Sequence, residues 1–199
     1  TSVNVTAGMT FAVGLRALLR QDPDIIMIGE TRDAETAEIS VRSAITGHLV
    51  VSTLHTNDAI SSIVRLADMG VAPYLISNSV VGIVAQRLVR KVCQFCKYEE
   101  PATAEDIAIV GDGIPMITRG KGCKVCNNTG YKGRISIHEM VYIDKTLKRM
   151  IARSADSQEM LEYAKKTQGM RSLMDSAIDL VKEGVTTPEE VMKIAYYSD

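Results

Sequence analysis

The stretch QDPDIIMIGETRDAETAEISVRSAITGHLVVSTLHTNDA, residues 21–59, decides how this chain folds. It contains two short apolar runs, residues 25–28 and 49–51, of the kind that forms buried strands in an α/β sheet. Each run leads to a polar side chain, Glu30 after the first and His55 after the second. The carboxyl ends of such strands are where open α/β sheets build ligand sites. A carboxylate and an imidazole there favour nucleotide chemistry.

Helical patterns surround the two runs. Apolar spacing predicts helices over residues 10–20, 34–45 and 58–69, with Asp33 and Asp58 as N-caps of the second and third. Pro73 suits the first turn of a further helix, which we expect to end near residue 90. Strands alternating with helices in this way predict an α/β fold with a mainly parallel sheet.

Two polar residues near these runs are expected to have local roles. Arg32 and Asp33 are adjacent and predict a local ion pair that contributes little to stability. His48 begins the second run rather than ending it, so we interpret it as structural.

Four cysteines provide the second strong signal. They form two C-x₂-C pairs, Cys93 with Cys96 and Cys123 with Cys126, separated by 26 residues. Four thiolates can complete a closed tetrahedral zinc site, which has no open position and is therefore structural. Basic residues surround the pairs and are expected to stabilise thiolate charge or to contact an acidic partner: Lys91, Lys97, Lys121, Lys124, Lys132 and Arg134.

The remainder of the chain is predicted to be mostly helical. Residues 134–143 alternate apolar and polar side chains like a half-buried strand. From residue 145 onward the pattern is helical, and Thr187-Pro188-Glu189-Glu190 predicts a capping box at the start of the last helix.

Composition excludes some functions. With a formal net charge of −1 over 199 residues, the chain as a whole has no electrostatic attraction to nucleic acid or anionic membrane. No apolar run approaches the roughly 18 residues that a membrane span needs. An alternative function is a non-catalytic zinc-ribbon binding module, with nucleic acid as a candidate partner. The absence of Trp and the presence of only two Phe weigh against it, since stacking needs aromatic platforms.

The pattern QDPDIIMIGETRDAETA followed by TGHLVVSTLHTNDA resembles the Walker B and His boxes of the secretion ATPase superfamily. More narrowly, it is similar to the ATPases of type II secretion and type IV pilus assembly. The resemblance implies that Glu30 holds Mg²⁺ or positions water and that His55 senses the γ-phosphate. It implies half of a RecA-like core over residues 1–90, a tetracysteine zinc module over 91–143 and a helical domain over 144–199.

The resemblance also implies a hexameric motor in which ATP hydrolysis drives pseudopilus or pilus subunit assembly. Its implied cofactors are ATP, Mg²⁺ and a structural Zn²⁺. Its implied partners are other copies of the chain and the inner-membrane platform and adaptor proteins, without nucleic acid. The implied location is the cytoplasm, peripheral to the inner membrane. The tetracysteine element favours assembly or secretion over pilus retraction.

The sequence contains no G-x-x-x-x-G-K-[ST] phosphate loop. Such a loop supplies the backbone cradle and the lysine that bind the β- and γ-phosphates. We therefore expect this chain to be a C-terminal part of a larger enzyme. The resemblance implies that the phosphate loop and the arginine fingers lie upstream. On this interpretation the chain alone is inactive.

Overall fold

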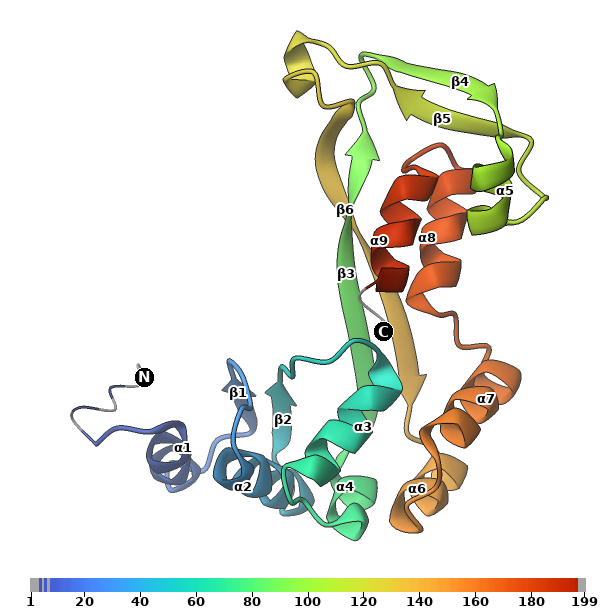
Figure 1. Cartoon of the computed structure of the whole chain (residues 1–199). Helices are drawn as coiled ribbons and strands as arrows, with labels where there is room; N and C mark the ends of the chain where they lie inside the picture. Colours follow the sequence, from blue (N-terminus) through green and yellow to red (C-terminus); the bar gives the residue numbers. More distant parts are fainter. Residues whose placement is uncertain (1–3, 5, 7, 197–199) are drawn as a thin grey trace. The chain divides into compact units, whose positions relative to one another are not determined.

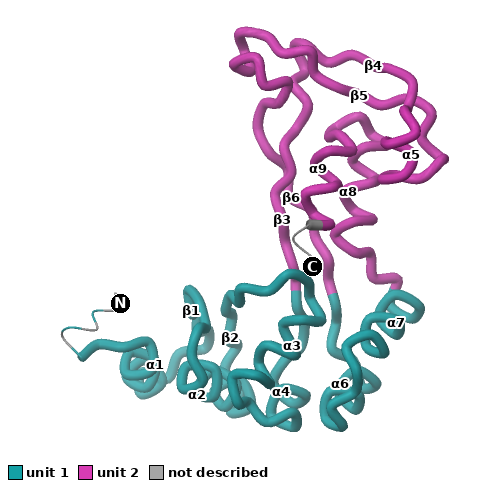
Figure 2. Tube along the Cα trace, in the orientation of Figure 1, with its two compact units in different colours: residues 1–83, 141–168 teal, residues 84–140, 169–199 magenta. Residues whose placement is uncertain are grey.

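A computed structural model of the chain describes residues 4, 6 and 8–196. The elements are labelled in Figure 1, and Figure 2 colours the two compact units into which they divide. Unit 1 comprises residues 1–83 and 141–168, and unit 2 comprises residues 84–140 and 169–199. The three-part division expected from the sequence, at residues 90 and 143, stays a prediction. No helix in the described ranges has the length and apolar character that crossing a membrane demands.

Unit 1 carries two strands and six helices within its described residues. In chain order they are α1 (Phe11–Leu19), β1 (Ile25–Ile28), α2 (Ala34–Ile45), β2 (Leu49–Ser52), α3 (Ala59–Asp68), α4 (Pro73–Ser79), α6 (Lys145–Ala152) and α7 (Ser157–Gln168). The predictions for residues 10–20, 25–28, 34–45, 49–51 and 58–69 are confirmed to within about two residues.

The strands β1 and β2 pair in parallel, with Ile25 opposite Leu49 and Ile28 opposite Ser52. One face of this pair is buried, because Ile26 and Ile28 pack with Leu15 of α1. The other face is open: Ile25, Met27, Leu49 and Val51 are 64%, 65%, 52% and 47% exposed. The expectation of fully buried strands is therefore wrong for the described residues, in which helices cover only one side.

Both predicted N-caps of unit 1 are confirmed. Asp33 accepts hydrogen bonds of 2.8 Å from the backbone N–H and the hydroxyl of Thr36, at the start of α2. Asp58 accepts a bond of 2.7 Å from the backbone N–H of Ser61, and a second from its hydroxyl, at the start of α3. The caps satisfy N–H groups that have no partner within the helix, which fixes where α2 and α3 begin.

Unit 2 is built from strands and short helices around the cysteines. Its elements are most of β3 (Gly82–Val92), β4 (Lys97–Pro101), α5 (Ala104–Val110), β5 (Met116–Gly120), a 3₁₀ turn (Lys124–Cys126), most of β6 (Tyr131–Tyr142), α8 (Leu173–Lys182) and α9 (Pro188–Tyr196). Strands β3 and β6 pair with each other, and β4 and β5 form an antiparallel pair. The strand expected over residues 134–143 is confirmed as β6.

The helix predicted from Pro73 to residue 90 is wrong. Helix α4 ends at Ser79, and the chain continues as strand β3. The β-branched side chains of Val80, Val81 and Ile83 disfavour continuation of the helix and favour a strand. From Gly82 to Val89, exposed residues alternate one by one with buried or half-buried ones, which is the period of a strand and not of a helix.

The expectation of a mainly parallel sheet holds only in part. In the described chain each of the three sheets has two strands, and β1–β2 is a parallel pair while β4–β5 is antiparallel. The fold is therefore a mixed α/β arrangement, and its parallel pair is the one that leads to Glu30 and His55.

Replacement of the cap of α3, Asp58→Ala, is expected to reduce the free energy of unfolding by about 1 kcal/mol, because the N–H of Ser61 loses its acceptor. Urea denaturation followed by circular dichroism measures the change. The control is Asp68→Ala at the other end of α3, where a carboxylate faces the negative end of the helix dipole and its loss is neutral or slightly stabilising. Equal destabilisation by both variants would contradict the assignment.

Candidate functional site

Three hydrogen bonds hold the ends of β1 and β2 together. The N–H of Thr31 donates to the carbonyl of Thr53 over 3.0 Å, and the hydroxyl of Thr53 donates to the carbonyl of Gly29 over 2.7 Å. The hydroxyls of Thr31 and Ser52 lie 2.8 Å apart. These bonds fix the backbone on both sides of Glu30, so its carboxylate has a defined position at the edge of the parallel pair.

The structure brings Glu30 and His55 together, as expected for neighbouring parallel strands. Glu30 Oε1 lies 2.5 Å from His55 Nε2, and Glu30 Oε2 lies 2.5 Å from Arg32 Nη2. The Glu30 side chain is 16% exposed, whereas those of His55 and Arg32 are 85% and 72% exposed. The carboxylate is thus sheltered between two nitrogen groups that remain open to solvent.

Arg32 was not recognised as part of this group from the sequence. The expected ion pair with Asp33 is wrong, because Asp33 points to the start of α2 as its cap while Arg32 binds Glu30. The signal was available in the spacing: side chains two residues apart on extended backbone point to the same side.

The charge state of Glu30 follows from its neighbours. The hydrogen bond from Arg32 lowers the pKa of the carboxyl, burial opposes this effect, and the charges of Arg32 and His55 add to it. Glu30 is therefore ionised at neutral pH. Its Oε1 lies 2.5 Å from His55 Nε2, and a hydrogen bond from His55 also lowers the pKa of the carboxyl. An ionised carboxylate at the end of a parallel strand pair is a ligand of the kind that Mg²⁺ or a Mg²⁺-bound water prefers.

His48 and His55 differ in their surroundings. His48 Nδ1 lies 3.0 Å from the carbonyl of Ser43 and serves the end of α2, in agreement with a structural role. His55 instead lines a hollow of ≈ 380 Å³ together with Arg65 and Asp68. Of the two histidines, only His55 meets both a carboxylate and open space.

The four cysteines of unit 2 form one cluster. Their sulfur atoms all lie within 4.8 Å of one another. The Sγ–Sγ distances are 3.9 Å for Cys93–Cys123, 3.9 Å for Cys96–Cys126 and 3.7 Å for Cys123–Cys126. A tetrahedral ion with sulfur at about 2.3 Å requires S–S separations of about 3.8 Å. The cluster therefore fits a metal such as zinc.

Each cysteine pair forms the same turn. The N–H of Cys96 donates to the carbonyl of Cys93 over 3.2 Å, and the N–H of Cys126 donates to that of Cys123 over 3.2 Å. The backbones also approach closely beside the turns, since a Cβ on Gly120 would lie 2.2 Å from the carbonyl oxygen of Gly130. Glycine is required at that contact.

The thiols of the cluster differ in acidity. Burial raises the pKa of Cys96 to about 12. Burial also opposes ionisation of Cys126, but hydrogen bonds to its sulfur from the backbone of Cys123 and Gly130 outweigh that effect and lower its pKa to about 6. Metal ligation requires thiolates, and the backbone N–H of Cys123, which donates to Cys126 Sγ over 3.2 Å, favours that form of Cys126.

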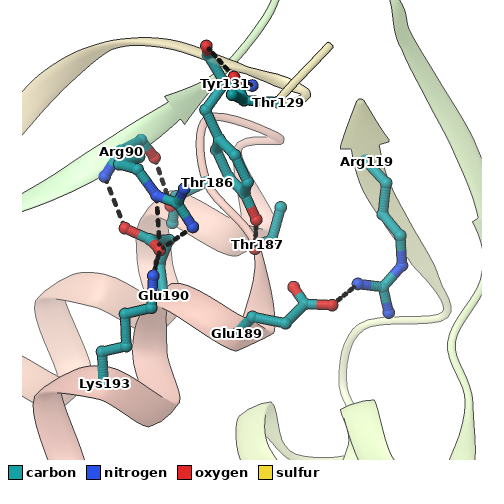
Figure 3. Close-up of polar contacts among 9 residues, drawn as sticks. All are labelled: Arg90, Arg119, Thr129, Tyr131, Thr186, Thr187, Glu189, Glu190 and Lys193. Atoms are coloured by element: carbon teal, nitrogen blue, oxygen red, sulfur yellow. Dashed lines mark hydrogen bonds and ion pairs between the residues drawn. The ribbon is translucent and has the colours of Figure 1, made fainter. Parts of the chain in front are cut away.

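A polar network joins the end of the cysteine segment to α9 within unit 2 (Figure 3). Arg90 binds Glu190 through its backbone N–H at 2.9 Å and its guanidinium at 2.8 Å and 3.0 Å, and Lys193 adds a bond of 2.6 Å. The Arg90 guanidinium also lies 3.9 Å from the centre of the Tyr131 ring. The Tyr131 hydroxyl lies 2.8 Å from that of Thr187. These contacts connect three distant parts of the sequence.

The capping box predicted at Thr187 is replaced by this network. Both carboxylate oxygens of Glu190 bind Arg90, so the side chain does not return to the N–H of Thr187. The neighbouring Glu189 binds Arg119, whose guanidinium also contacts Glu100 and Asp106. Glu189 and Glu190 therefore have structural roles that short-range sequence patterns could not reveal.

Comparison with known proteins extends these observations. The family profile described as Type II/IV secretion system protein matches residues 1–193. Type II secretion system protein E of Pseudomonas aeruginosa is 48% identical over 98% of this chain, and the type II secretion system ATPase E of Vibrio cholerae is 47% identical over 98%. The type IV pilus assembly ATPase PilB of Thermus thermophilus is 46% identical over 96%. The chain spans 39%, 39% and 22% of these relatives.

Solved structures agree on the fold. The pilus retraction motor PilT with bound ADP matches with a TM-score of 0.66 and 28% identity, over 93% of this chain and 43% of that one. The Legionella pneumophila ATPase DotB matches with a TM-score of 0.62 and 22% identity, over 94% and 42% of the two chains. The second likeness concerns the fold alone.

Replacement of Arg32 by Gln is expected to raise the pKa of Glu30, because the carboxylate loses its strongest hydrogen bond. Carboxyl ¹³C chemical shifts followed against pH measure this change. Glu30 contributes stability above its ordinary pKa of 4.5, and this contribution is lost as pH falls through the lower folded value. In Arg32→Gln the free energy of unfolding should therefore change less with pH in this acidic range. The control is Arg42→Gln, which removes an arginine paired with Glu38. An unchanged Glu30 titration in Arg32→Gln would contradict the assignment.

Proposed function

Since the chain belongs to the type II/IV secretion system protein family, we propose that it is the C-terminal part of a hexameric ATPase that powers type II secretion or type IV pilus assembly. The chain spans 39% of its first two relatives above, so the activity of the whole protein is part of the proposal. The observation that carries the proposal is the sheltered Glu30 carboxylate, held between Arg32 and His55 at the end of the parallel strand pair.

In this proposal unit 1 contributes half of a RecA-like nucleotide site. Glu30, kept ionised by Arg32, holds a metal-bound water or orients the water that attacks the terminal phosphate. His55 lies against the same carboxylate and has an exposed ring, so a change at Glu30 is transmitted to the loop that follows β2. A bound Mg²⁺ would neutralise charge on the phosphates. The phosphate loop and arginine fingers come from the remainder of a longer polypeptide.

The tetracysteine cluster is proposed to hold a structural zinc ion through Cys93, Cys96, Cys123 and Cys126. The S–S distances near 3.8 Å support this choice. Four protein ligands leave no coordination position for water, so the ion stabilises the fold and takes no part in catalysis. The cluster also supports a role in assembly or secretion rather than retraction.

The proposed setting is a homo-hexamer in the cytoplasm, at the inner membrane, in contact with platform and adaptor proteins of the secretion or pilus machine. Family membership supports it. ATP hydrolysis there would be coupled to assembly of pseudopilus or pilus subunits.

Purified chain is expected to contain about one zinc per polypeptide by inductively coupled plasma mass spectrometry. A zinc chelator is expected to lower its melting temperature by roughly 10 °C, because the ion contributes to the folding of a polar segment. The control is the double variant Cys96→Ser/Cys126→Ser, which should melt low and not respond to the chelator. A metal-free preparation with an unchanged melt would remove the zinc site from the proposal.

Turnover tests the nucleotide site. In the longer parent protein, Glu30→Gln is expected to reduce kcat by on the order of 100-fold or more while ATP binding persists, because water is no longer oriented by a carboxylate. The matched control is Glu38→Gln, an exposed glutamate of α2 paired with Arg42, which should leave kcat within about twofold.

The isolated chain is expected not to hydrolyse ATP. Retention of most of the turnover in the parent Glu30→Gln variant would refute the proposed role of Glu30. Turnover by the isolated chain that Glu30→Gln abolishes would refute the requirement for an upstream phosphate loop.

A further inference from the structure

Positive charge is concentrated around the two cysteine turns. Residues 86–98 contain four Lys or Arg residues and no Asp or Glu, and residues 120–138 again contain four and none. The whole chain has 23 basic and 24 acidic residues, so this concentration is local. A closed zinc–tetrathiolate centre carries a net charge of about −2, which balances only part of it.

Most of these cations are exposed and have no acidic partner. Arg90 is committed to Glu190. By contrast, five exposed side chains form no ion pair with any residue that the structure describes: Lys97, Lys121, Lys124, Lys132 and Arg134. Charges that served only to balance the thiolates would not need to face solvent.

Each cysteine turn also presents an apolar side chain to solvent. Phe95 is 72% exposed and Val125 is 43% exposed, and they occupy the same position, directly before the second cysteine of each pair. Lys132 Nζ lies 5.8 Å from the centre of the Phe95 ring. An exposed aromatic side chain beside unpaired cations is typical of a protein-binding surface, because aromatic residues are the usual anchors of interfaces.

We propose that these seven residues, the knuckle surface, bind an acidic segment of a partner protein that also carries an apolar side chain: Phe95, Lys97, Lys121, Lys124, Val125, Lys132 and Arg134. The carboxylates of the segment pair with the basic residues, and its apolar side chain covers Phe95 and Val125. Charge complementarity of this kind sets the rate and specificity of association.

Two other anionic partners fit the surface less well. Insertion of Phe95 into a lipid bilayer would carry the Lys132 ammonium toward hydrocarbon, at a cost in free energy. Single-stranded nucleic acid binds on several stacked aromatic side chains, whereas Phe95 is the one exposed phenylalanine of the cysteine turns. A peptide carboxylate can pair with the Lys132 ammonium while that group stays in water.

The test is the fluorescence anisotropy of a fluorescein-labelled peptide of alternating glutamate and leucine, titrated with zinc-loaded chain. Saturable binding is expected, and it should weaken several-fold between about 50 and about 300 mM NaCl. Lys124→Gln/Lys132→Gln is expected to weaken it roughly tenfold, and Phe95→Ser severalfold. The matched control, Lys165→Gln/Lys166→Gln on α7, should bind within about twofold of the unchanged chain.

Zinc content and melting temperature of each variant establish that it is folded, and the exposed lysine variants carry the test if Phe95→Ser is unfolded. Three results would overturn the proposal. The first is no saturable peptide binding, and the second is an equal loss in the α7 control. The third is tighter binding of phosphatidylglycerol vesicles or oligothymidine than of the peptide, which would assign the surface to a membrane or to nucleic acid.

Discussion

The buried carboxylate of Glu190 is the interaction on which unit 2 depends. A charge at a site where the side chain is only 5% exposed is tolerated only if it is fully paired, and Arg90 and Lys193 supply that pairing. Burial opposes ionisation of Glu190, yet the bonds from Arg90 and Lys193 lower its pKa. The same Arg90 also stacks on Tyr131, at the end of the cysteine segment (Figure 3). One ion pair therefore orders a strand, a helix start and the segment next to the cluster.

Local patterns predicted local structure well. The strand at residues 25–28, the helix at residues 34–45 and the caps Asp33 and Asp58 depend on side chains within four positions of one another, which periodicity can reveal. The same holds for the cysteine pairs, whose spacing defines their turns. The approach of Glu30 to His55 was also predictable, because parallel strands end at a common edge.

What the sequence could not reveal depends on distant partners. Residues 82–92 mix apolar with polar side chains, and pairing with β6 decides that they form a strand. Glu190 has the spacing of a capping residue, but its partner Arg90 lies 100 positions away. Arg32 has two carboxylates near it in the sequence, those of Glu30 and Asp33. Because Asp33 caps helix α2, Arg32 pairs with Glu30. In each case a contact outside the local window overrides a sound local preference.

The open face of β1 and β2 has a consequence for handling the protein. Four apolar side chains are bare on a short sheet whose strands each have one edge without a partner among the described residues. Such a surface offers both hydrophobic contact and unpaired backbone groups to another extended chain. Both features favour edge-to-edge aggregation. The strands that carry the proposed chemistry are therefore also a site at which the polypeptide can aggregate. Aggregation in solution therefore depends on whether a binding partner covers Ile25, Met27, Leu49 and Val51.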